Sequence, residues 1–333
     1  EIVNSDWSSD VCSSDLEHSI FTTGLDFCYS FHQNDTMISV SYPISSSVSA
    51  SQIDFNFYDR CIYSGVKGKE PNICGMLYDE VTHEEHCVKE GKVIIKLQKS
   101  NVSIWPILII KQSSQGIDPK SQFLLGVYND AMGDEENAFS LIFQSAKRCF
   151  FPAQVLVADV LMSDANPYGV EKNVEQALHF LESIEKEYVT EEIIKTMVNA
   201  CIELGLREKA LEILKNEIDN SKELKKMYAK MLSPLSDKEG NQPELAVEYL
   251  NDLSKENDVE AIELLANHYS KGIGVKKDIK HSKELIKRIN EIDPNYRKDN
   301  KISGIATNIL VTIVLSSIFI GAASFVWYKK RKN

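Results

Sequence analysis

Residues 261–278 read AIELLANHYSKGIGVKKD, and this stretch decides the fold class of the chain. Its first nine residues carry apolar side chains at the three- and four-residue spacing of an amphipathic helix. Gly272 and Gly274 then supply the positive φ that a tight turn between two helices requires. Asp278 suits the N-terminal end of a following helix, because its carboxylate accepts from free backbone amides there. The stretch therefore predicts a helix, a turn and the start of a second helix.

The same arrangement recurs upstream at a nearly constant spacing. Small residues that suit close helix packing lie 39, 33, 36 and 36 positions apart, at Ala138, Ala177, Ala210, Ala246 and Ser282. A period near 36 in a helical region is typical of stacked two-helix repeats. Residues 121–293 are therefore predicted to form an α-solenoid of about five two-helix repeats.

The last repeat resembles the Sel-one-like repeat, the longer-turn relative of the tetratricopeptide repeat. The resemblance implies that Ala261 lets the helices approach closely, that Tyr269 fills the gap between them, and that the first helices line a concave, protein-binding face. Earlier copies match the pattern less completely. The residues that match it in the last repeat are Ala261, Leu265, Tyr269, Gly272, Gly274, Val275 and Asp278.

Residues 17–115 show a different pattern, with apolar and polar residues alternating in short runs. Residues 37–42 (MISVSY) and 53–58 (IDFNFY) alternate in this way, and 93–97 and 107–110 are rich in β-branched residues. Such runs predict an antiparallel, β-sandwich-like domain. The polar stretch 112–120 is expected to link it to the helices, which makes the chain an α+β multi-domain protein.

The most apolar segment is residues 305–328, which contain no charged residue. At about 1.5 Å per residue this length spans a hydrocarbon core of ~30 Å, so we expect one transmembrane helix after a stalk at 294–304. The basic tail 329–333 is expected to stay cytosolic, which makes the protein a type I single-pass membrane protein. A dilysine-type retrieval signal is a second interpretation of this tail. Its basic residues are Lys329, Lys330, Arg331 and Lys332.

Two glycosylation sequons and a group of cysteines favour a luminal or extracellular location for the β domain. The sequons begin at Asn34 and Asn101. Cys149 and Cys201 lie among apolar helix positions and are expected to be free core residues. We expect at least one disulfide among the remaining cysteines, and weigh a zinc site at Cys74, His83, His86 and Cys87 against it. The disulfide candidates are Cys28, Cys61, Cys74 and Cys87.

Residues 1–16 are set apart because 5–16, SDWSSDVCSSDL, resemble a translated sequencing-library adapter. We therefore expect that Cys12 does not belong to the natural protein and that its natural N-terminus lies further upstream.

Composition limits the class of function. The chain has a formal net charge of -12 and is 43% hydrophobic, so it is globular and does not carry the basic footprint of a nucleic-acid-binding protein. It has no recognisable catalytic or cofactor motif, and we expect a non-enzymatic protein without cofactors. We expect a scaffold or adaptor for protein partners. A cell-surface receptor and a tail-anchored, cytosol-facing adaptor remain as alternatives.

The order of repeats and C-terminal anchor resembles the luminal receptor subunit of the endoplasmic-reticulum degradation ubiquitin ligase. The resemblance implies a role in protein quality control, a location in the endoplasmic-reticulum membrane and a ubiquitin-ligase membrane subunit as a partner.

Overall fold

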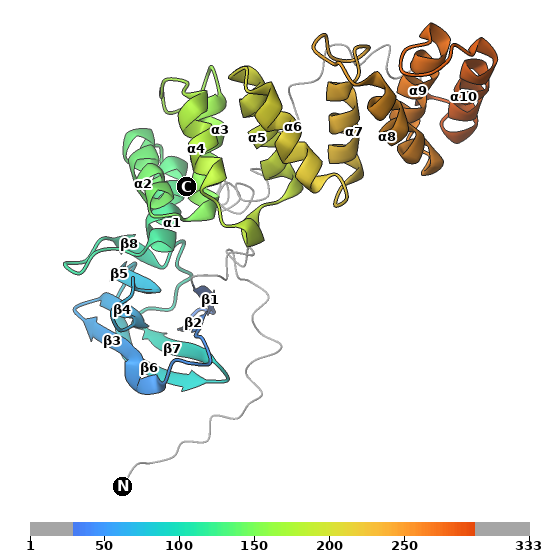
Figure 1. Cartoon of the computed structure of the whole chain (residues 1–333). Helices are drawn as coiled ribbons and strands as arrows, with labels where there is room; N and C mark the ends of the chain where they lie inside the picture. The colour runs from blue at the N-terminus through green and yellow to red at the C-terminus, as the bar shows by residue number, and fades with distance from the viewer. Residues whose placement is uncertain (1–28, 297–333) are drawn as a thin grey trace. The chain divides into compact units, whose positions relative to one another are not determined.

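A computed structural model describes residues 29–296 of the chain. Within this range the chain forms two compact units (Figure 1). The first comprises residues 29–157 and 165–170, and the second comprises residues 158–164 and 171–296. Residues 1–28, the predicted transmembrane segment 305–328 and the basic tail lie outside the described residues, as do Cys28 and most of the predicted stalk.

The first unit contains two four-stranded antiparallel sheets, which confirms the predicted antiparallel β domain. The sheet orders are β1-β2-β7-β6 and β3-β4-β5-β8. The strands are β1 (Ser30–Gln33), β2 (Met37–Pro43), β3 (Ile53–Tyr58), β4 (Cys61–Val66), β5 (Ile73–Leu77), β6 (Val81–Lys89), β7 (Lys92–Lys99) and β8 (Ile109–Lys111).

Alternation along the strands produces the core between the two sheets. Ile38, Val40 and Tyr42 on β2 are buried, while the residues between them are partly exposed. Every second side chain of a strand points to the same face, so these three pack inward together. The Tyr42 hydroxyl lies 2.7 Å from the Ser64 hydroxyl on β4, so a buried hydrogen bond joins one sheet to the other.

The predicted linker at 112–120 does not separate the β domain from the first helices. Asp118, inside it, is fully buried and caps α1 (Pro119–Ala131). One carboxylate oxygen accepts from the Ser121 amide at 2.8 Å, and the other accepts from the Cys74 amide on β5 at 2.9 Å. Burial raises the pKa of Asp118 to about 6. The polar composition of the segment predicts a linker, but the Asp118 carboxylate joins α1 to β5 through hydrogen bonds.

The helix pair α1 and α2 (Glu135–Lys147) completes the first unit together with the start of α3 (Phe151–Met162). The two helices of this pair approach closely at Gly126, where an added Cβ would lie 2.7 Å from a side-chain carbon of Ile142. The Ser145 hydroxyl donates to the Pro119 carbonyl at 2.7 Å. The β domain and the first hairpin therefore form one compact unit.

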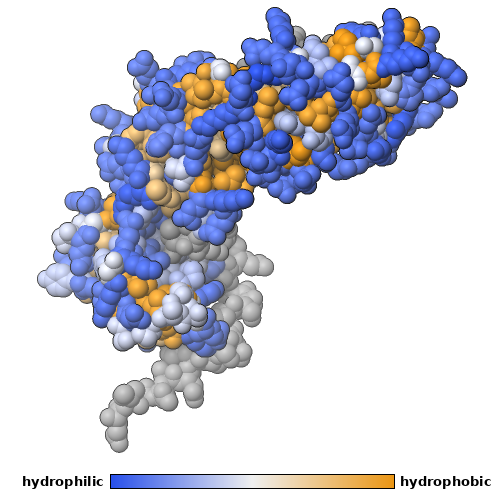
Figure 2. All heavy atoms as spheres, viewed as in Figure 1, coloured by the Kyte–Doolittle hydropathy of each residue, from blue (hydrophilic) through white to orange (hydrophobic). Residues whose placement is uncertain are grey.

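The second unit is a stack of helices that follow one another in chain order. Including the helices of the first unit, ten α-helices in five consecutive pairs lie within residues 29–296, as the sequence period predicted. All five predicted small anchors are buried. Figure 2 shows hydrophilic residues over much of the helices' visible face, with apolar patches between them. The helices of this unit are α4 (Val174–Glu182), α5 (Glu191–Glu203), α6 (Arg207–Glu217), α7 (Lys222–Leu232), α8 (Pro243–Lys255), α9 (Val259–Lys271) and α10 (Ile279–Ile292).

None of the helices within residues 29–296 is both long enough and apolar enough to cross a membrane.

Candidate functional site

The last hairpin, α9 and α10, has the local structure that its sequence pattern predicts. Ala261 and Leu265 are buried against the preceding hairpin and the partner helix. Asp258 caps α9 by accepting from the Ala261 amide at 2.8 Å, and Asp278 caps α10 by accepting from the His281 amide at 2.9 Å. The Tyr269 ring lies edge-on to the His281 ring at 4.5 Å between centroids, so it fills the space between the two helices.

The turn between these helices also forms part of the junction with the preceding hairpin. Gly272 ends α9 with a φ of 72°, and Gly274 has a φ of 68°. A Cβ at Gly274 would lie 2.3 Å from the carbonyl oxygen of Pro243, the first residue of α8. Val275 packs against the apolar cluster that contains Ala261 and Leu265. Gly274 is therefore required for the turn and for the close approach of the two hairpins.

A buried histidine, which sequence analysis missed, reinforces the same junction. The Nδ1 of His268 donates to the Ile273 carbonyl at 2.8 Å, and Nε2 lies 2.8 Å from the Ser233 hydroxyl. Because a carbonyl only accepts, Nε2 is the acceptor of the Ser233 proton. Burial lowers the pKa of His268. Ser233 and His268 lie 35 residues apart, close to one repeat period, and this spacing is the only signal of the pair in the sequence.

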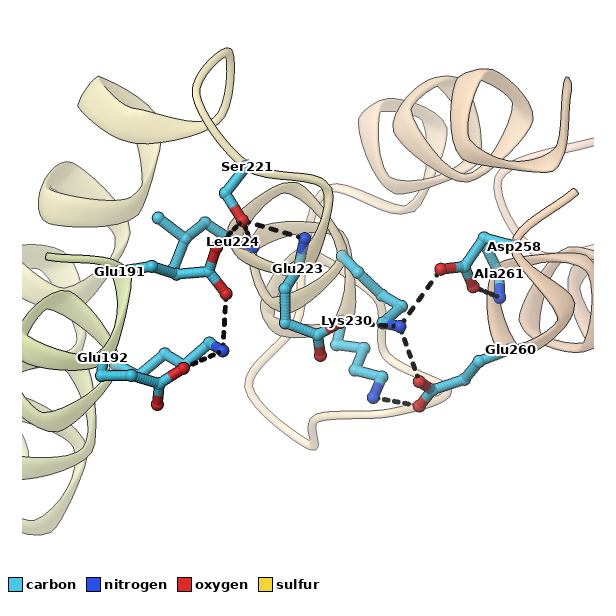
Figure 3. Close-up of polar contacts among 11 residues, drawn as sticks. Glu191, Glu192, Ser221, Glu223, Leu224, Lys230, Asp258, Glu260 and Ala261 are labelled. Carbon is cyan, nitrogen blue, oxygen red and sulfur yellow. Dashed lines mark hydrogen bonds and ion pairs between the residues drawn. The ribbon is translucent and has the colours of Figure 1, made fainter. Parts of the chain in front are cut away.

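The first helices of the last three hairpins, α5, α7 and α9, are joined by a continuous set of polar contacts (Figure 3). Between α5 and α7, the Ser221 hydroxyl donates to Glu191 at 2.7 Å. Lys195 pairs with Glu191 at 2.6 Å and with Glu192 at 3.0 Å. We call the whole set the first-helix ladder, which consists of Glu191, Glu192, Lys195, Ser221, Glu223, Lys226, Lys230, Asp258 and Glu260.

Lys226 is the centre of the contacts between α7 and α9. Its ammonium lies 3.0 Å from Glu223, 3.2 Å from Asp258 and 3.1 Å from Glu260. Lys230 also pairs with Glu260. Burial by itself lowers the pKa of Lys226, but the three carboxylates outweigh it and raise this pKa above its usual value. The ammonium therefore stays charged, and it holds the two first helices together.

Two carboxylates of the ladder face solvent, while its central lysine is buried. The Lys226 side chain is 9% exposed, whereas the side chains of Glu192 and Glu223 are 66% and 45% exposed. The ladder contains five carboxylates and three lysines, so its formal charge is −2. Opposite charges attract strongly near a protein surface, where the effective dielectric is below that of water.

The two predicted glycosylation sites lie at the same end of the β domain. Asn34 and Asn101 are both exposed. The ammonium of buried Lys99 donates to the Asn34 carbonyl at 2.7 Å and to the Ser103 carbonyl at 2.5 Å. The Ser103 amide donates to the Asp35 carbonyl at 2.9 Å. The structure thus brings together two sequons that are far apart in the sequence.

The predicted disulfide is absent among the three candidates that the structure describes. Cys61, Cys74 and Cys87 are free thiols on β4, β5 and β6. Cys87 lies in the other sheet and is exposed, while Cys74 is buried and its pKa is raised by burial. Cys201 is a free buried residue, as predicted. For Cys149 the prediction of a core position was wrong, because it is exposed and follows α2 with a φ of 60°.

The candidate zinc ligands are not brought together. Cys74 is on β5, whereas His83, His86 and Cys87 are on the exposed strand β6 of the other sheet. His86 instead stacks on the Phe55 ring, with 4.1 Å between ring centroids. No group of three or more histidine, cysteine or acidic side chains suited to a metal ion occurs among residues 29–296.

Comparison with known proteins identifies the first part of the chain most specifically. A family profile described as CS domain matches residues 28–99, which end with the last residue of β7. A search of proteins with curated functions found no match.

Several solved structures are similar to parts of this chain. The nuclear movement protein from E. cuniculi GB-M1 is 23% identical, covers 25% of this chain and 98% of its own length, and has a TM-score of 0.22. A Sel1 repeat protein from Oxalobacter formigenes is 18% identical over 52% of this chain and 73% of its own, with a TM-score of 0.40. A protective antigen of uropathogenic Escherichia coli with an SLR fold is 19% identical, covers 65% of this chain and 48% of its own length, and has a TM-score of 0.38.

Proposed function

We propose that this chain is a scaffold that binds protein partners through the first-helix face of its repeats. The observation that carries the proposal is the first-helix ladder, which joins α5, α7 and α9 in order and leaves acidic side chains in solvent. Stacked helical pairs present extended surfaces of this kind, and such surfaces suit partner binding. The proposal assigns binding, and not catalysis, to the chain.

The charge of the ladder indicates the chemistry of the partner. Its net negative charge, with Glu192 and Glu223 exposed and Lys226 buried, favours a segment that carries lysine or arginine side chains. Because the ladder lysines already neutralise part of the negative charge, a partner is held by several weak contacts and not by one strong ion pair. We expect binding that weakens as the salt concentration rises.

We further propose that the scaffold is anchored in the endoplasmic-reticulum membrane by residues 305–328, with the repeats in the lumen. The support is the uncharged length of this segment and the basic residues that follow it. A partner role beside a ubiquitin-ligase membrane subunit, in protein quality control, agrees with this architecture. Glycosidase sensitivity separates this orientation from the tail-anchored alternative.

The test is cross-linking mass spectrometry on the full chain in its native membrane. Partner cross-links are expected at α5, α7 and α9, and they should be lost when Glu192 and Glu223 are both replaced by lysine. The matched control is the same change at Glu212 and Glu248, which are exposed residues of the second helices α6 and α8. Equal loss in both variants, or cross-links confined to the β domain, contradicts the proposal.

A further inference from the structure

The last hairpin carries a concentration of positive charge that differs from the rest of this acidic chain. Residues 271–288 contain seven basic residues and two acidic residues, a local net charge of +5, whereas the whole chain has a net charge of -12. The basic residues are Lys271, Lys276, Lys277, Lys280, Lys283, Lys287 and Arg288.

Four of these lysines are exposed and have no ion-pair partner among residues 29–296, namely Lys276, Lys277, Lys280 and Lys283. Lys226 in the first-helix ladder, by contrast, contacts three carboxylates. Unpaired lysines in a cluster repel one another, so holding them together has an electrostatic cost. An anionic partner removes that cost.

The lysines of α10 share the side of the helix that faces away from the core. Ser282, Leu285 and Ile289 are the buried residues of α10. Residues three, four and seven positions apart lie on one face of a helix, so Lys280 and Lys283 fall together on the opposite side. α10 is the last labelled helix of the second unit in Figure 1, and hydrophilic residues form its outer margin in Figure 2. We call the four lysines and this side of α10 the lysine face.

The described chain ends at the opposite end of α10 from the four lysines and is held against the last hairpin there. After α10, the Tyr296 hydroxyl donates to Glu263 on α9 at 3.2 Å, and the ring packs against the core of the last hairpin. Eight residues, 297–304, separate Tyr296 from the apolar segment that begins at Ile305. An extended chain reaches at most ~3.5 Å per residue, so Tyr296 stays within about 30 Å of that segment. The lysines lie roughly 20 Å further along α10, so they reach the bilayer when α10 lies along its surface.

We propose that the lysine face rests on the surface of the membrane and binds anionic lipid headgroups. The inference relies on the proposed anchor for its geometry, because the anchor keeps the last hairpin close to the bilayer, and it requires anionic lipid in the leaflet that the hairpin faces. Each lysine near an anionic surface strengthens the attraction by about fivefold, and the attraction disappears beyond a Debye length of ~8 Å at physiological salt. The contact fixes the end of the repeat array near the membrane and leaves the first-helix ladder free for a protein partner.

A bilayer fits this face better than a second class of anionic macromolecule. The lysines spread over a turn and one side of a helix. Ile279 lies at their edge, and its side chain is 53% exposed. Lysines with an apolar neighbour suit a lipid interface, where the apolar side chain enters the headgroup region. The overall negative charge of the chain opposes binding to nucleic acid.

The test measures lysine acylation in the full chain reconstituted into vesicles. An amine-reactive ester is added to phosphatidylcholine vesicles with and without about 30% phosphatidylserine, and modification of each lysine is followed by mass spectrometry. We expect the lysine face to react at least threefold more slowly in the anionic vesicles, and this protection to vanish in 1 M salt. Lys186, Lys215 and Lys238, which are exposed elsewhere in the second unit, should react equally in both.

Charge reversal supplies the second arm. Replacing Lys276, Lys280 and Lys283 by glutamate should abolish the protection of Lys277, which remains as a reporter. The matched control replaces Lys186, Lys215 and Lys238 by glutamate and should leave the protection of Lys277 unchanged.

Three outcomes decide the proposal. Equal acylation in neutral and anionic vesicles overturns it. Protection by soluble polyglutamate or single-stranded DNA, without protection by vesicles, also overturns it and assigns the face to that polyanion. Alkaline carbonate extraction reports separately on the anchor. If the chain is extracted and the lysines are still protected by anionic vesicles, the anchor fails and the lipid-binding proposal stands.

Discussion

Replacing Gly274 by alanine is expected to loosen the junction between the last two hairpins. Gly274 has a φ of 68°, and an added Cβ would lie 2.3 Å from the carbonyl oxygen of Pro243 and 2.4 Å from its carbonyl carbon. Both are backbone atoms at the start of α8, so they cannot rotate away as the end of a flexible side chain can. Either α8 or the turn at 272–278 must therefore move.

The expected cost combines a conformational and a steric part. A side chain at a left-handed φ costs about 1–2 kcal/mol. Overpacking against atoms that do not yield costs about 1–3 kcal/mol. Alanine also restricts the unfolded chain more than glycine does, which offsets about 0.4–1 kcal/mol of this cost. The net loss in the free energy of opening the junction is therefore about 1–4.6 kcal/mol.

Gly205, in the turn between α5 and α6, is a matched control. Its φ is 71°, and a Cβ there would meet no atom within 4 Å. Gly205→Ala therefore has the conformational part of the cost without the steric part, about 0–1.6 kcal/mol after the unfolded-state term. The difference between the two variants isolates the contact with Pro243.

Hydrogen exchange of the full chain, followed by mass spectrometry, suits this comparison because stacked repeats open locally. In Gly274→Ala, peptides from α9 and α10 should exchange about 5-fold to about 2000-fold faster, since 1.4 kcal/mol corresponds to a factor of ten. Gly205→Ala should leave these peptides unchanged and affect α5 and α6 only slightly. If the two variants accelerate exchange of their own hairpins equally, the close approach at Pro243 contributes nothing and the reasoning is refuted.

Asp118→Ala should destabilise the first unit by about 2–4 kcal/mol, because it removes a helix cap and leaves a buried β5 amide unpaired; a calorimetric loss below about 1 kcal/mol would count against this role. The lowered pKa of His268 predicts that the second unit loses stability as pH falls below ~6.5, since the unfolded chain then binds a proton that the folded chain does not. Urea midpoints at pH 7 and 5 test this, and His268→Gln should reduce the difference. The raised pKa of Asp118, about 6, has the opposite sign and stabilises the first unit as pH falls from 6 toward 4, which unit-specific hydrogen exchange can resolve. When the protein is expressed with its natural N-terminus, luminal exposure of Asn34 and Asn101 should let glycosidase digestion shift its gel mobility in two steps. Asn34→Gln and Asn101→Gln should each remove one step. No shift at either site would favour the tail-anchored orientation.

Local patterns in the sequence were sufficient for the elements themselves. The period of about 36 residues predicted the number of helical pairs, because each pair buries one apolar side and needs a small residue where its helices meet. Gly272, Gly274 and Asp278 have the turn and cap roles that their residue types indicate, because these roles depend on the backbone within a few residues. Alternation likewise predicted the strands of the β domain.

The contacts that the sequence did not reveal join residues from different elements. Lys226 reaches Asp258 and Glu260, and Ser233 reaches His268, one repeat further along the chain. In the sequence these were charged or polar residues like many others. Their partners became defined only when the helices stacked and excluded water, because a charge or a hydrogen bond gains its specificity from that packing.

The sequence by itself determined an antiparallel β domain followed by about five helical pairs, since period, turn and cap signals are local. Only the tertiary structure decided where one compact unit ends and the next begins. Asp118 lies in a segment with the composition of a linker, yet it is buried between β5 and α1. A carboxylate is removed from water in this way only where the fold brings backbone donors to it. Here the donors are the amides of Cys74, 44 residues before Asp118, and of Ser121, three residues after it.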